Sequence, residues 1–376
     1  MRVLVVNAGS SSLKLSLLDE HERVIAAREL DAPRAQVDPG ELSDALSPEL
    51  SHADAVGHRI VHGGERYRGA TLVDPELRRA LGALADLAPL HQPKSLAALD
   101  AVSRALPDVP AVACFDTAFH ATLPPAAATY ALPQEWRERW GLRRYGFHGL
   151  SHAWVARRTP QLLAGLPQLQ RDPSALRIVS CHLGAGASLC AIRGGRSLDT
   201  TMGFTPLEGL VMATRAGSVD PGLLLWLAED RRVSVTELAD ALEHRSGLLG
   251  LCASADMREV VSRANHGEEP ARLALEVYLH RLRGGVAAMA AALGGLDVLV
   301  FTGGVGERSP EVRARAADGL GFLEVALDDR RNRDAGADAD VSAPAARVRT
   351  LVLAAREDAE IALQTRALLR APGSGS

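Results

Sequence analysis

The chain has 376 residues, of which 47% are hydrophobic and 23% charged, and its formal net charge is −4. This length exceeds the common domain size of about 100–150 residues, so we expect two domains. No apolar run reaches the ~20 residues of a membrane span, and the interspersed charges exclude a nucleic-acid-binding surface. The apolar start ends at Asn7, too soon for a secretion signal. We therefore expect a cytoplasmic protein that acts on a small substrate.

The positions of the lysines and cysteines indicate which kinds of site the chain can contain. Lysine occurs only at Lys14 and Lys94, and arginine supplies the rest of the 42 positive charges. A lysine beside a turn of Gly and Ser is therefore informative. The four cysteines contain no C-x-x-C pair and lie in strand-like apolar segments. We expect buried thiols rather than a disulfide framework or a zinc site.

The chain opens with an apolar strand, a turn rich in Gly and Ser, and a second strand with alternating apolar residues. These elements cover residues 3–6, 7–12 and 13–17. The same order returns at residues 177–182, 183–188 and 189–192. Two copies of one pattern in a single chain indicate duplicated domains.

Further elements follow in chain order. Helical patterns cover residues 74–87 and 92–106, and an apolar strand at 111–115 ends at Asp116. A strand at 297–301 leads into the glycine-rich residues 302–307, and Ser309 and Pro310 then predict a helix start. Gly319 predicts a left-handed helix end. A strand at 349–353 precedes the last helix, and we expect residues 372–376 to be disordered.

Three turns rich in Gly and Ser, at residues 7–12, 184–188 and 303–306, would let the backbone approach phosphate oxygens closely. None of them matches the P-loop or the dinucleotide-binding pattern, and each also fits an ordinary hairpin turn. Their occurrence together favours ATP as a ligand.

Residues 57–65 alternate polar and apolar side chains, which places Arg59 and Val61 on one face of a strand. A guanidinium beside an apolar patch suits a small aliphatic carboxylate, although a solvated surface arginine fits the same spacing. The pairs His58/His62 and His148/His152 are each four residues apart, but no third ligand stands at a metal-site spacing. Hydrogen-bonded histidines are therefore the preferred interpretation.

Seven colinear motifs resemble the acetate kinase family. They are residues 6–14 (Val-Asn-Ala-Gly-Ser-Ser-Ser-Leu-Lys), 58–64 (His-Arg-Ile-Val-His-Gly-Gly), 115–120 (Phe-Asp-Thr-Ala-Phe-His), 145–149 (Tyr-Gly-Phe-His-Gly), 182–184 (His-Leu-Gly), 202–209 (Met-Gly-Phe-Thr-Pro-Leu-Glu-Gly) and 301–307 (Phe-Thr-Gly-Gly-Val-Gly-Glu). Their order and spacing extend over nearly the whole chain, which excludes a chance match.

The resemblance implies an α/β fold of the superfamily that includes acetate and sugar kinases, heat-shock chaperone ATPases and actin. Two ribonuclease H-like (actin-like ATPase) domains would each contain a mixed five-stranded sheet flanked by helices, with the active site in the interdomain cleft. Residues 1–120 and 358–376 would form the acceptor-side domain. Residues 121–357 would bind the nucleotide and form the homodimer that is usual in the family.

The resemblance also implies a role for each matching position. Asp116, His148, Arg215 and Arg59 would be catalytic. Asn7 and Glu357 would hold Mg²⁺, with Mn²⁺ as an alternative. The acceptor site would consist of Arg59, Val61, Leu90, Phe147 and Pro206. ATP or ADP would contact Lys14, His182, Leu183, Gly184, Ala185, Gly186, Asp256, Met257, Arg258, Gly304, Val305, Gly306, Glu307 and Arg308.

The implied activity belongs to acetate metabolism: a reversible, magnesium-dependent kinase reaction that converts ATP and acetate to ADP and acetyl phosphate. The phosphoryl group would pass directly in line while cationic groups neutralise its charge. Because acetate is already ionised at neutral pH, Asp116 would orient groups rather than act as a strong base. Three positions depart from the family pattern: Ala185 replaces an expected asparagine, and Arg356 and Asp358 flank Glu357 in place of a small polar residue and a glutamate.

Two alternatives remain open. One methylene group in an apolar pocket is worth only ~1–3 kcal/mol, so propionate or butyrate is an alternative acceptor. A non-catalytic ATP-driven switch would share the same fold. The acceptor set of Arg59, Asp116, His148 and Arg215 argues against the switch.

Overall fold

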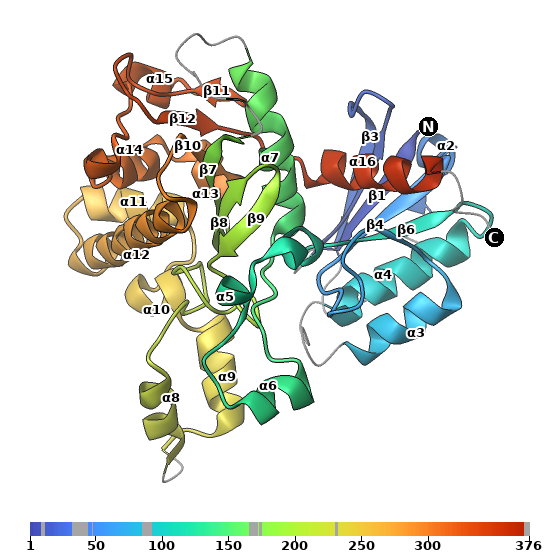
Figure 1. The fold of residues 1–376 in the computed structure, drawn as a ribbon, viewed down its shortest axis with the longest axis horizontal. Helices are drawn as coiled ribbons and strands as arrows, with labels where there is room; N and C mark the ends of the chain where they lie inside the picture. Colours follow the sequence, from blue (N-terminus) through green and yellow to red (C-terminus); the bar gives the residue numbers. More distant parts are fainter. Residues whose placement is uncertain are drawn as a thin grey trace. The chain divides into compact units, whose positions relative to one another are not determined.

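The computed structural model describes residues 1–8, 12–31, 44–46, 48–84, 92–164, 172, 175–229 and 232–371. The chain divides into two compact units, and Figure 1 colours it along the sequence. The first unit contains Met1–Ala121, Phe147–Trp154 and Arg356–Ser376, and the second contains Thr122–Gly146 and Val155–Ala355. This division assigns residues 147–154 to the first unit, whereas the family resemblance implied a first domain of residues 1–120 and 358–376. The tail at 372–376 lies outside the described residues.

A six-stranded sheet with the order β3-β2-β1-β4-β6-β5 forms the centre of the first unit. Strand β1 is antiparallel to β2 and parallel to β4, and β6 is parallel to β4. The edge strands β3 and β5 are antiparallel to their neighbours. The strands are β1 (Val3–Ala8), β2 (Ser12–Leu18), β3 (Val24–Asp31), β4 (Ala55–Ile60), β5 (Thr71–Leu72) and β6 (Ala111–Phe115).

The second unit repeats this arrangement with the order β11-β12-β10-β7-β8-β9. Each pairing has the same direction as its counterpart in the first sheet. The predicted duplication is therefore confirmed. Each sheet has six strands rather than the expected five, because each gains an edge strand of two residues, β5 or β11, too short to show a pattern in sequence. The strands are β7 (Arg177–Leu183), β8 (Ala187–Arg193), β9 (Arg196–Thr200), β10 (Val298–Thr302), β11 (Ala339–Asp340) and β12 (Arg349–Val352).

Helices flank both sheets. Those of the first unit are α2 (Pro48–Ser51), α3 (Pro75–Ala83), α4 (Gln92–Ala105), the 3₁₀ helix η3 (Ala118–Thr122) and α16 (Glu357–Arg370). Helix α7 (Gly149–Leu163) begins in the first unit and continues in the second. The second unit contains α5 (Pro125–Ala128), α6 (Gln134–Trp140), α8 (Pro221–Ala228), α9 (Val235–His244), α10 (Gly247–Cys252), α11 (Met257–Asn265), α12 (Glu269–Leu293), α13 (Gly303–Arg308), α14 (Pro310–Asp318), η6 (Gly321–Leu323) and α15 (Asp329–Arg333).

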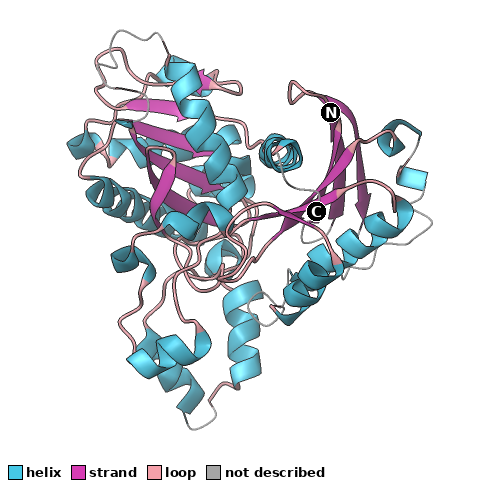
Figure 2. Cartoon of the chain, turned by 45° about the vertical axis from the view of Figure 1, so that its right-hand side comes forward, coloured by secondary structure: helices cyan, strands magenta, loops and turns pink. Residues whose placement is uncertain are grey.

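Alternation along β1 explains how its sheet is covered on both faces. Val3 and Val5 pack in a buried cluster with Ile361 of α16. Leu4 and Val6 point to the opposite face and pack with Val102 of α4. Figures 1 and 2 show helices on both sides of this sheet. A strand buried on both faces reads as a continuous apolar run, which is why the sequence revealed β1 so clearly.

The predicted elements mostly occur where expected. Strand β6 has the predicted bounds, and Ser309 caps α14 by accepting a hydrogen bond from the backbone N–H of Val312. The left-handed helix end at Gly319 is wrong, because its φ is −86°. Glycine leaves space there instead, since a Cβ atom would lie 2.4 Å from Nε of Arg283 and the arginine side chain would have to shift. Across the described ranges, no helix combines the length and apolar character needed to cross a membrane.

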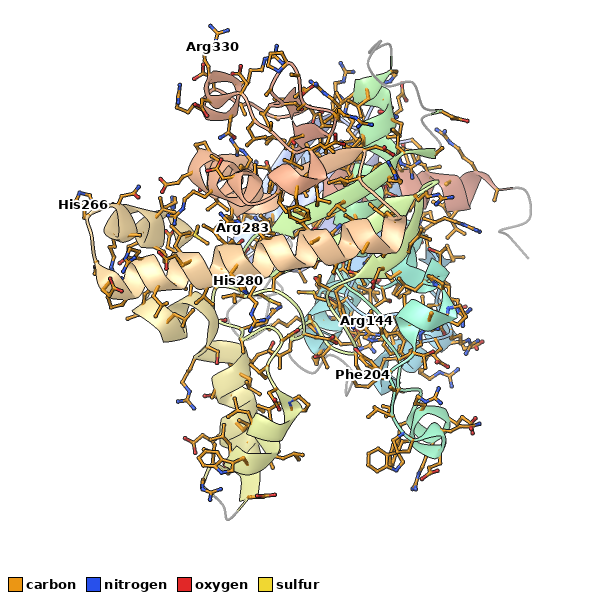
Figure 3. All side chains as sticks on the ribbon, turned by 60° about the vertical axis from the view of Figure 1, so that its left-hand side comes forward. Arg144, Phe204, His266, His280, Arg283 and Arg330 are labelled. Carbon is orange, nitrogen blue, oxygen red and sulfur yellow. The ribbon has the colours of Figure 1, made fainter. Side chains whose placement is uncertain are left out.

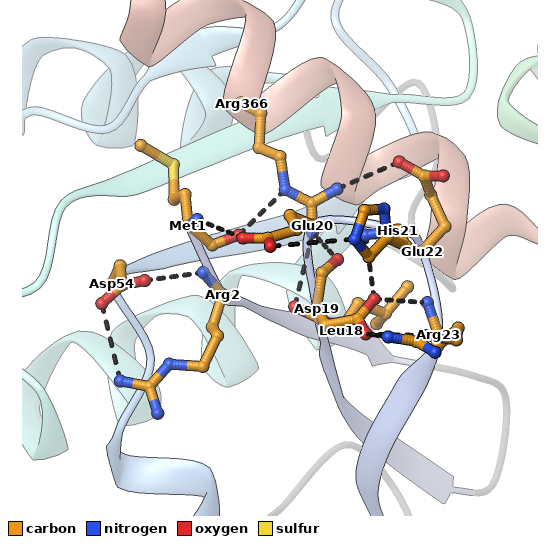
Figure 4. Close-up of polar contacts among 10 residues, drawn as sticks. All are labelled: Met1, Arg2, Leu18, Asp19, Glu20, His21, Glu22, Arg23, Asp54 and Arg366. Atoms are coloured by element: carbon orange, nitrogen blue, oxygen red, sulfur yellow. Dashed lines mark hydrogen bonds and ion pairs between the residues drawn. The ribbon is translucent and has the colours of Figure 1, made fainter.

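A buried arginine ties the last helix to the first hairpin (Figure 4). Arg366 of α16 donates from Nε to the carbonyl oxygen of Met1 at 3.1 Å and from Nη2 to that of Leu18 at 3.4 Å. Its side chain is 5% exposed and lies 3.4 Å from the carboxylate of Glu22. The guanidinium thus satisfies backbone carbonyl groups at the end of the sheet where β1 starts and β2 stops.

We expect Arg366→Met to lower the free energy of unfolding by about 2–4 kcal/mol, because the buried carbonyl groups would lose their donors. Denaturant titration followed by circular dichroism measures this change. Arg370→Met, at an exposed position of the same helix, is the matched control and should change stability by less than about 0.5 kcal/mol. Equal stability of the two variants would contradict the assignment.

Candidate active site

Four polar side chains of the first unit form one hydrogen-bonded cluster. Arg59, near the end of β4, donates Nε and Nη2 to Oδ2 of Asp116 at 3.0 and 2.7 Å. Its Nη1 donates to Oδ1 of Asn7 at 3.0 Å. Nδ2 of Asn7 donates to Oε2 of Glu357 at 3.3 Å, and Arg59 lies 3.9 Å from that same oxygen. Strands β1, β4 and β6 and helix α16 therefore bring together residues that are distant in sequence.

One guanidinium in this cluster faces two carboxylates. Asp116 is 1% exposed, and burial together with Glu357 raises its pKa, although Arg59 acts in the opposite direction. Burial disfavours the charged form of Arg59 as well, but Asp116 and Glu357 outweigh burial and raise the pKa of Arg59. Oδ1 of Asp116 is buried and accepts no hydrogen bond. The cluster therefore has more anionic groups than cationic ones and an oxygen atom with unused acceptor capacity.

The oxygen atoms of this cluster fit a hard divalent cation. Asn7, Asp116 and Glu357 offer amide and carboxylate oxygens, which Mg²⁺ prefers. A buried oxygen without a partner, such as Oδ1 of Asp116, is costly unless something binds to it. By contrast, no group of three or more His, Cys, Asp or Glu side chains in the described part of the chain could hold a metal ion.

His148 lies in a tight turn directly before α7. Its φ is +55°, a left-handed conformation that residues with a Cβ atom rarely adopt. The backbone N–H of Gly149 donates to the carbonyl oxygen of Asp116 at 2.9 Å. A Cβ atom at Gly149 would lie only 2.1 Å from that oxygen, so this close approach requires glycine. The turn therefore places the backbone of His148 beside that of Asp116.

In the second unit, two glycine-rich segments lie next to each other. Gly303, at the start of α13, has φ +78°, and a Cβ atom there would lie 2.8 Å from the carbonyl oxygen of Leu183. The backbone N–H of Ala213 donates to the carbonyl oxygen of Ala185 at 3.0 Å. The departure at Ala185 therefore coexists with a backbone contact that joins its loop to the segment carrying Arg215.

A buried guanidinium binds backbone carbonyl groups of helix α13. Arg313 of α14 is 1% exposed and donates from Nη1 to the carbonyl oxygens of Gly306 and Glu307 at 2.9 and 2.8 Å. Oε1 of Glu307 accepts a hydrogen bond from the backbone N–H of Ala355 at 3.0 Å. The Glu307 carboxylate thus connects α13 to the segment that follows β12.

Arg215 is held by partners within the second unit, among them Sδ of Met212, which lies 3.8 Å from Nη1. Its Nη1 donates to the carbonyl oxygen of Pro206 at 3.2 Å, and its Nε lies 3.3 Å from Oε1 of Glu243 in α9. Burial lowers the pKa of Arg215 and Glu243 opposes this, but an arginine remains charged in proteins. The side chain of Thr214 also donates to the carbonyl oxygen of Glu243 at 2.9 Å. The end of α9 therefore fixes the position of Arg215.

A polar network holds the segment that carries Pro206. Oη of Tyr130 donates to Glu208 at 2.6 Å and accepts a hydrogen bond from the backbone N–H of Phe204 at 2.9 Å. Arg144 donates to the other oxygen of Glu208 at 2.8 Å and to two backbone carbonyl groups of residues 201–202. Figure 3 labels Arg144 and Phe204 among the side chains of this region. The network explains why the 202–209 motif contains a glutamate.

Known proteins resemble this chain over nearly its whole length. A model of the acetokinase family matches residues 40–363. An acetate kinase of Gloeobacter violaceus is 44% identical over 405 aligned positions, which cover 96% of this chain and 98% of that protein. The chain belongs to the acetokinase family.

Two solved structures agree with acetokinase membership. The crystal structure of Porphyromonas gingivalis acetate kinase matches with a TM-score of 0.88 at 35% identity and covers 98% of this chain and 100% of that one. A propionate kinase from Francisella tularensis matches with a TM-score of 0.88 at 32% identity and covers 97% and 99%. These matches confirm the α/β fold expected from the sequence.

The structure connects some of the acetokinase positions directly and leaves others apart. Asn7, Arg59, Asp116 and Glu357 form the cluster. His148, Phe147 and Val61 belong to the same unit as this cluster. Lys14 of β2 lies 3.7 Å from Glu29 and is 60% exposed. Asp256 caps α11 by accepting from the backbone of Arg258, which is 86% exposed. Leu90 and part of the loop at 7–12 lie outside the described residues.

Several residues that support these acetokinase motifs were missed in sequence. Glu243 belongs to a helix with no recognisable motif, and nothing in its spacing marks it as the partner of Arg215. Arg313 lies on α14 among alanine, valine and charged residues, in no recognisable motif. His120 is part of the 115–120 motif and received no role. Motif position alone would have been a signal for His120, whereas the other two depend on tertiary contacts.

His58 makes stability depend on pH. It lies on β4 with both ring nitrogens buried and without a hydrogen bond, and burial lowers its pKa to about 4, although Asp100 opposes the shift. Burial also lowers the pKa of His62 to about 4. The unfolded chain binds these protons near pH 6.5 and the folded chain only near pH 4, so stability is complete above pH 6.5 and falls as the pH decreases.

Each histidine should contribute a loss of roughly 3 kcal/mol in the free energy of unfolding between these two pH values. Denaturant titrations across this pH window measure the loss. His58→Leu should remove about half of the slope attributable to the two histidines, because His62 still titrates. An unchanged slope in His58→Leu would show that His58 is not buried in its neutral form.

Proposed function

We propose that the protein transfers the γ-phosphoryl group of ATP to acetate, giving acetyl phosphate and ADP, and that it catalyses the reverse reaction as well. Membership of the acetokinase family makes it a kinase. The single observation that carries the proposal is the partly buried cluster of Asn7, Arg59, Asp116 and Glu357. The guanidinium of Arg59 is permanently charged and can bind a carboxylate, and the other three residues supply hard oxygen donors for a cation. A carboxylate kinase needs both functions.

Arg59 is the proposed acceptor ligand. A guanidinium has five N–H groups, and the cluster engages Nε, Nη1 and Nη2 once each, so two N–H groups have capacity for acetate. Asp116 orients Arg59 rather than accepting a proton, because acetate is already ionised at neutral pH. Val61 and Phe147 are buried in the same unit and would contact the methyl group together with Leu90 and Pro206.

Charge on the transferring phosphoryl group has to be neutralised in an in-line reaction. We assign this role to Arg215 and His148, with His148 donating a hydrogen bond from its ring. Asn7 and Glu357 would hold Mg²⁺, or Mn²⁺ instead, beside Asp116. When bound, such a cation neutralises negative charge on the phosphates. No phosphorylated enzyme residue is required.

The nucleotide is assigned to the second unit. Backbone groups of residues 182–186 and 304–308 would approach the phosphates, since their glycines leave room for close contact. Asp256, Met257 and Arg258 would contact the nucleoside, and Lys14 of the first unit would contact a phosphate after leaving Glu29. Arg59 and Arg215 belong to different units, so the proposed reaction needs groups from both.

The remaining expectations about organisation are part of the same proposal. Residues 1–120 with 358–376 would be the acceptor-side domain, and residues 121–357 the nucleotide-binding domain that also forms a homodimer. The protein would act in the cytoplasm. Size-exclusion chromatography with light scattering tests the dimer.

Trapping of acyl phosphate with hydroxylamine tests the activity. The protein is incubated with ATP, Mg²⁺ and acetate, propionate or butyrate, with glycerol as the acceptor that lacks a carboxylate. We expect hydroxamate with the carboxylates, the highest kcat/KM for acetate, and none with glycerol. The absence of hydroxamate with every carboxylate would remove the proposed function.

Propionate is the second candidate acceptor, because one matching structure is a propionate kinase. One methylene group is worth ~1–3 kcal/mol in an apolar pocket, which corresponds to a roughly 10–200-fold ratio of kcat/KM. The chain-length series above therefore separates the two acceptors. A higher kcat/KM for propionate would reassign the substrate while leaving the reaction type unchanged.

A further inference from the structure

The backbone of His148 occupies a conformation that needs support. Its φ of +55° is disfavoured by contacts of the Cβ atom, and residues in such conformations persist only where the surroundings hold them. The turn is also short, since α7 starts at the next residue, Gly149. The question is which groups hold this turn.

Hydrogen bonds hold the peptide groups on both sides of His148, and one of them runs from the backbone N–H of His152 to the carbonyl oxygen of His148 at 3.0 Å. On one side, the backbone N–H of Gly149 donates to the carbonyl oxygen of Asp116 at 2.9 Å. On the other side, Nε2 of His120 lies 2.9 Å from the carbonyl oxygen of Phe147. A carbonyl oxygen only accepts, so His120 carries a proton on Nε2 and donates it. Asp116 and His120 belong to the same short segment after β6.

The ring of His120 is itself held firmly. His120 is 1% exposed, and its ring makes edge contacts with the rings of Phe119 and His152, each with 5.7 Å between centroids. His152 is fully buried in the first turn of α7. The donor that reaches Phe147 therefore has little freedom to move, which is the requirement for positioning a neighbouring group precisely.

We propose that His120 is a positioning residue for phosphoryl transfer: its Nε2–H group holds the Phe147 carbonyl and thereby keeps His148 in its left-handed conformation beside Asp116. His120 acts through the backbone and does not touch the substrate. The proposal rests on the function proposed above. It gives a role to the last residue of the 115–120 motif, which the reaction itself leaves unused.

The test compares three substitutions of His120. His120→Gln keeps an N–H donor at nearly the same distance from the backbone. His120→Leu fills the space without a donor. The side chain of His120→Asn carries a donor but is too short to reach the Phe147 carbonyl. We expect kcat for acetate phosphorylation to fall by roughly 10²-fold in the Leu and Asn variants, because a misplacement of about 1 Å has this effect. The KM for ATP should stay within about threefold, and the Gln variant should stay within about fivefold of the wild-type kcat.

A double-mutant cycle separates positioning from general support of the fold. In a His148→Ala background the ring that His120 positions is gone, so adding His120→Leu should cost less than about threefold more. If the fold-losses in kcat of the two single variants multiply in the double variant, the proposal is overturned. Unchanged kcat in both His120→Leu and His120→Asn would overturn it as well. If His120→Leu does not fold, His120→Asn replaces it in the cycle.

The two proposals fail in different ways. Wild-type protein that forms no hydroxamate with any carboxylate would overturn the proposed function and with it the role of His120 in transfer. Active wild-type protein with active Leu and Asn variants would overturn the role of His120 alone. Thermal unfolding of each variant shows that it is folded at the assay temperature.

Discussion

Arg59→Ala should lower kcat/KM for acetate by roughly 10³-fold or more, equivalent to about 4 kcal/mol of transition-state stabilisation. The reason is that one guanidinium performs several tasks. It donates twice to Asp116 and once to Asn7, and it is the proposed ligand of the acceptor. The hydroxamate assay at varied acetate concentration measures the loss. Turnover within tenfold of the wild type would refute the assignment.

Arg59→Ala should also reduce stability, because Asp116 is buried and would lose its cationic partner. Removal of one partner from a buried ion pair costs about 3–5 kcal/mol. The double variant Arg59→Ala/Asp116→Asn should recover much of this stability without recovering activity. Arg66→Ala is the control, since Arg66 pairs with Glu76 on the surface and both are more than half exposed. It should change neither quantity appreciably.

Arg215→Ala should lower kcat by roughly 10²–10³-fold, with a smaller effect on stability than Arg59→Ala. Arg215 is assigned to the charge of the transferring phosphoryl group, so its loss should affect kcat more than the KM for acetate. The carboxylate of Glu243, which pairs with Arg215, is 18% exposed, whereas that of Asp116, which pairs with Arg59, is 1% exposed. Steady-state kinetics with thermal unfolding measures both effects.

Arg245, directly after α9, is a matched control for Arg215, which pairs with Glu243 of the same helix. Arg245 pairs with Asp240 at 2.8 Å and is 54% exposed, so Arg245→Ala should retain kcat within about twofold. A similar loss in Arg245→Ala and Arg215→Ala would point to a general effect on α9 rather than to phosphoryl transfer. Normal turnover of Arg215→Ala would remove its assigned role.

Elements with strong local patterns could be predicted from sequence. Strand β6 follows from an apolar run, and the last helix, α16, was expected after the strand at 349–353. The duplicated order of strands also follows from the repeat. The left-handed end at Gly319 was wrong because glycine has two uses, an unusual φ and the absence of a Cβ atom, and only the neighbour Arg283 reveals which one applies.

Some residues of the candidate site could be predicted from sequence motifs, and others are revealed only by tertiary contacts. The motifs identified Asn7, Arg59, Asp116 and Glu357 individually, but spacing left a surface arginine as a valid interpretation of Arg59. The hydrogen bonds of the cluster exclude that interpretation, because they join residues on two strands, the residue that follows a third strand, and one helix. Glu243 and Arg313 could not be predicted at all, since each is defined by a contact with another element of the fold.

The amino-acid sequence by itself determined the family, the duplicated α/β architecture and the residue types available for chemistry, because periodicity and motif order are local and additive along a chain. Tertiary structure alone decided which charges are buried together, that Asp116 has an oxygen without a partner, and that His148 is held in a left-handed turn. Burial, pKa and backbone strain depend on the neighbours that folding brings into contact, and no local pattern encodes them.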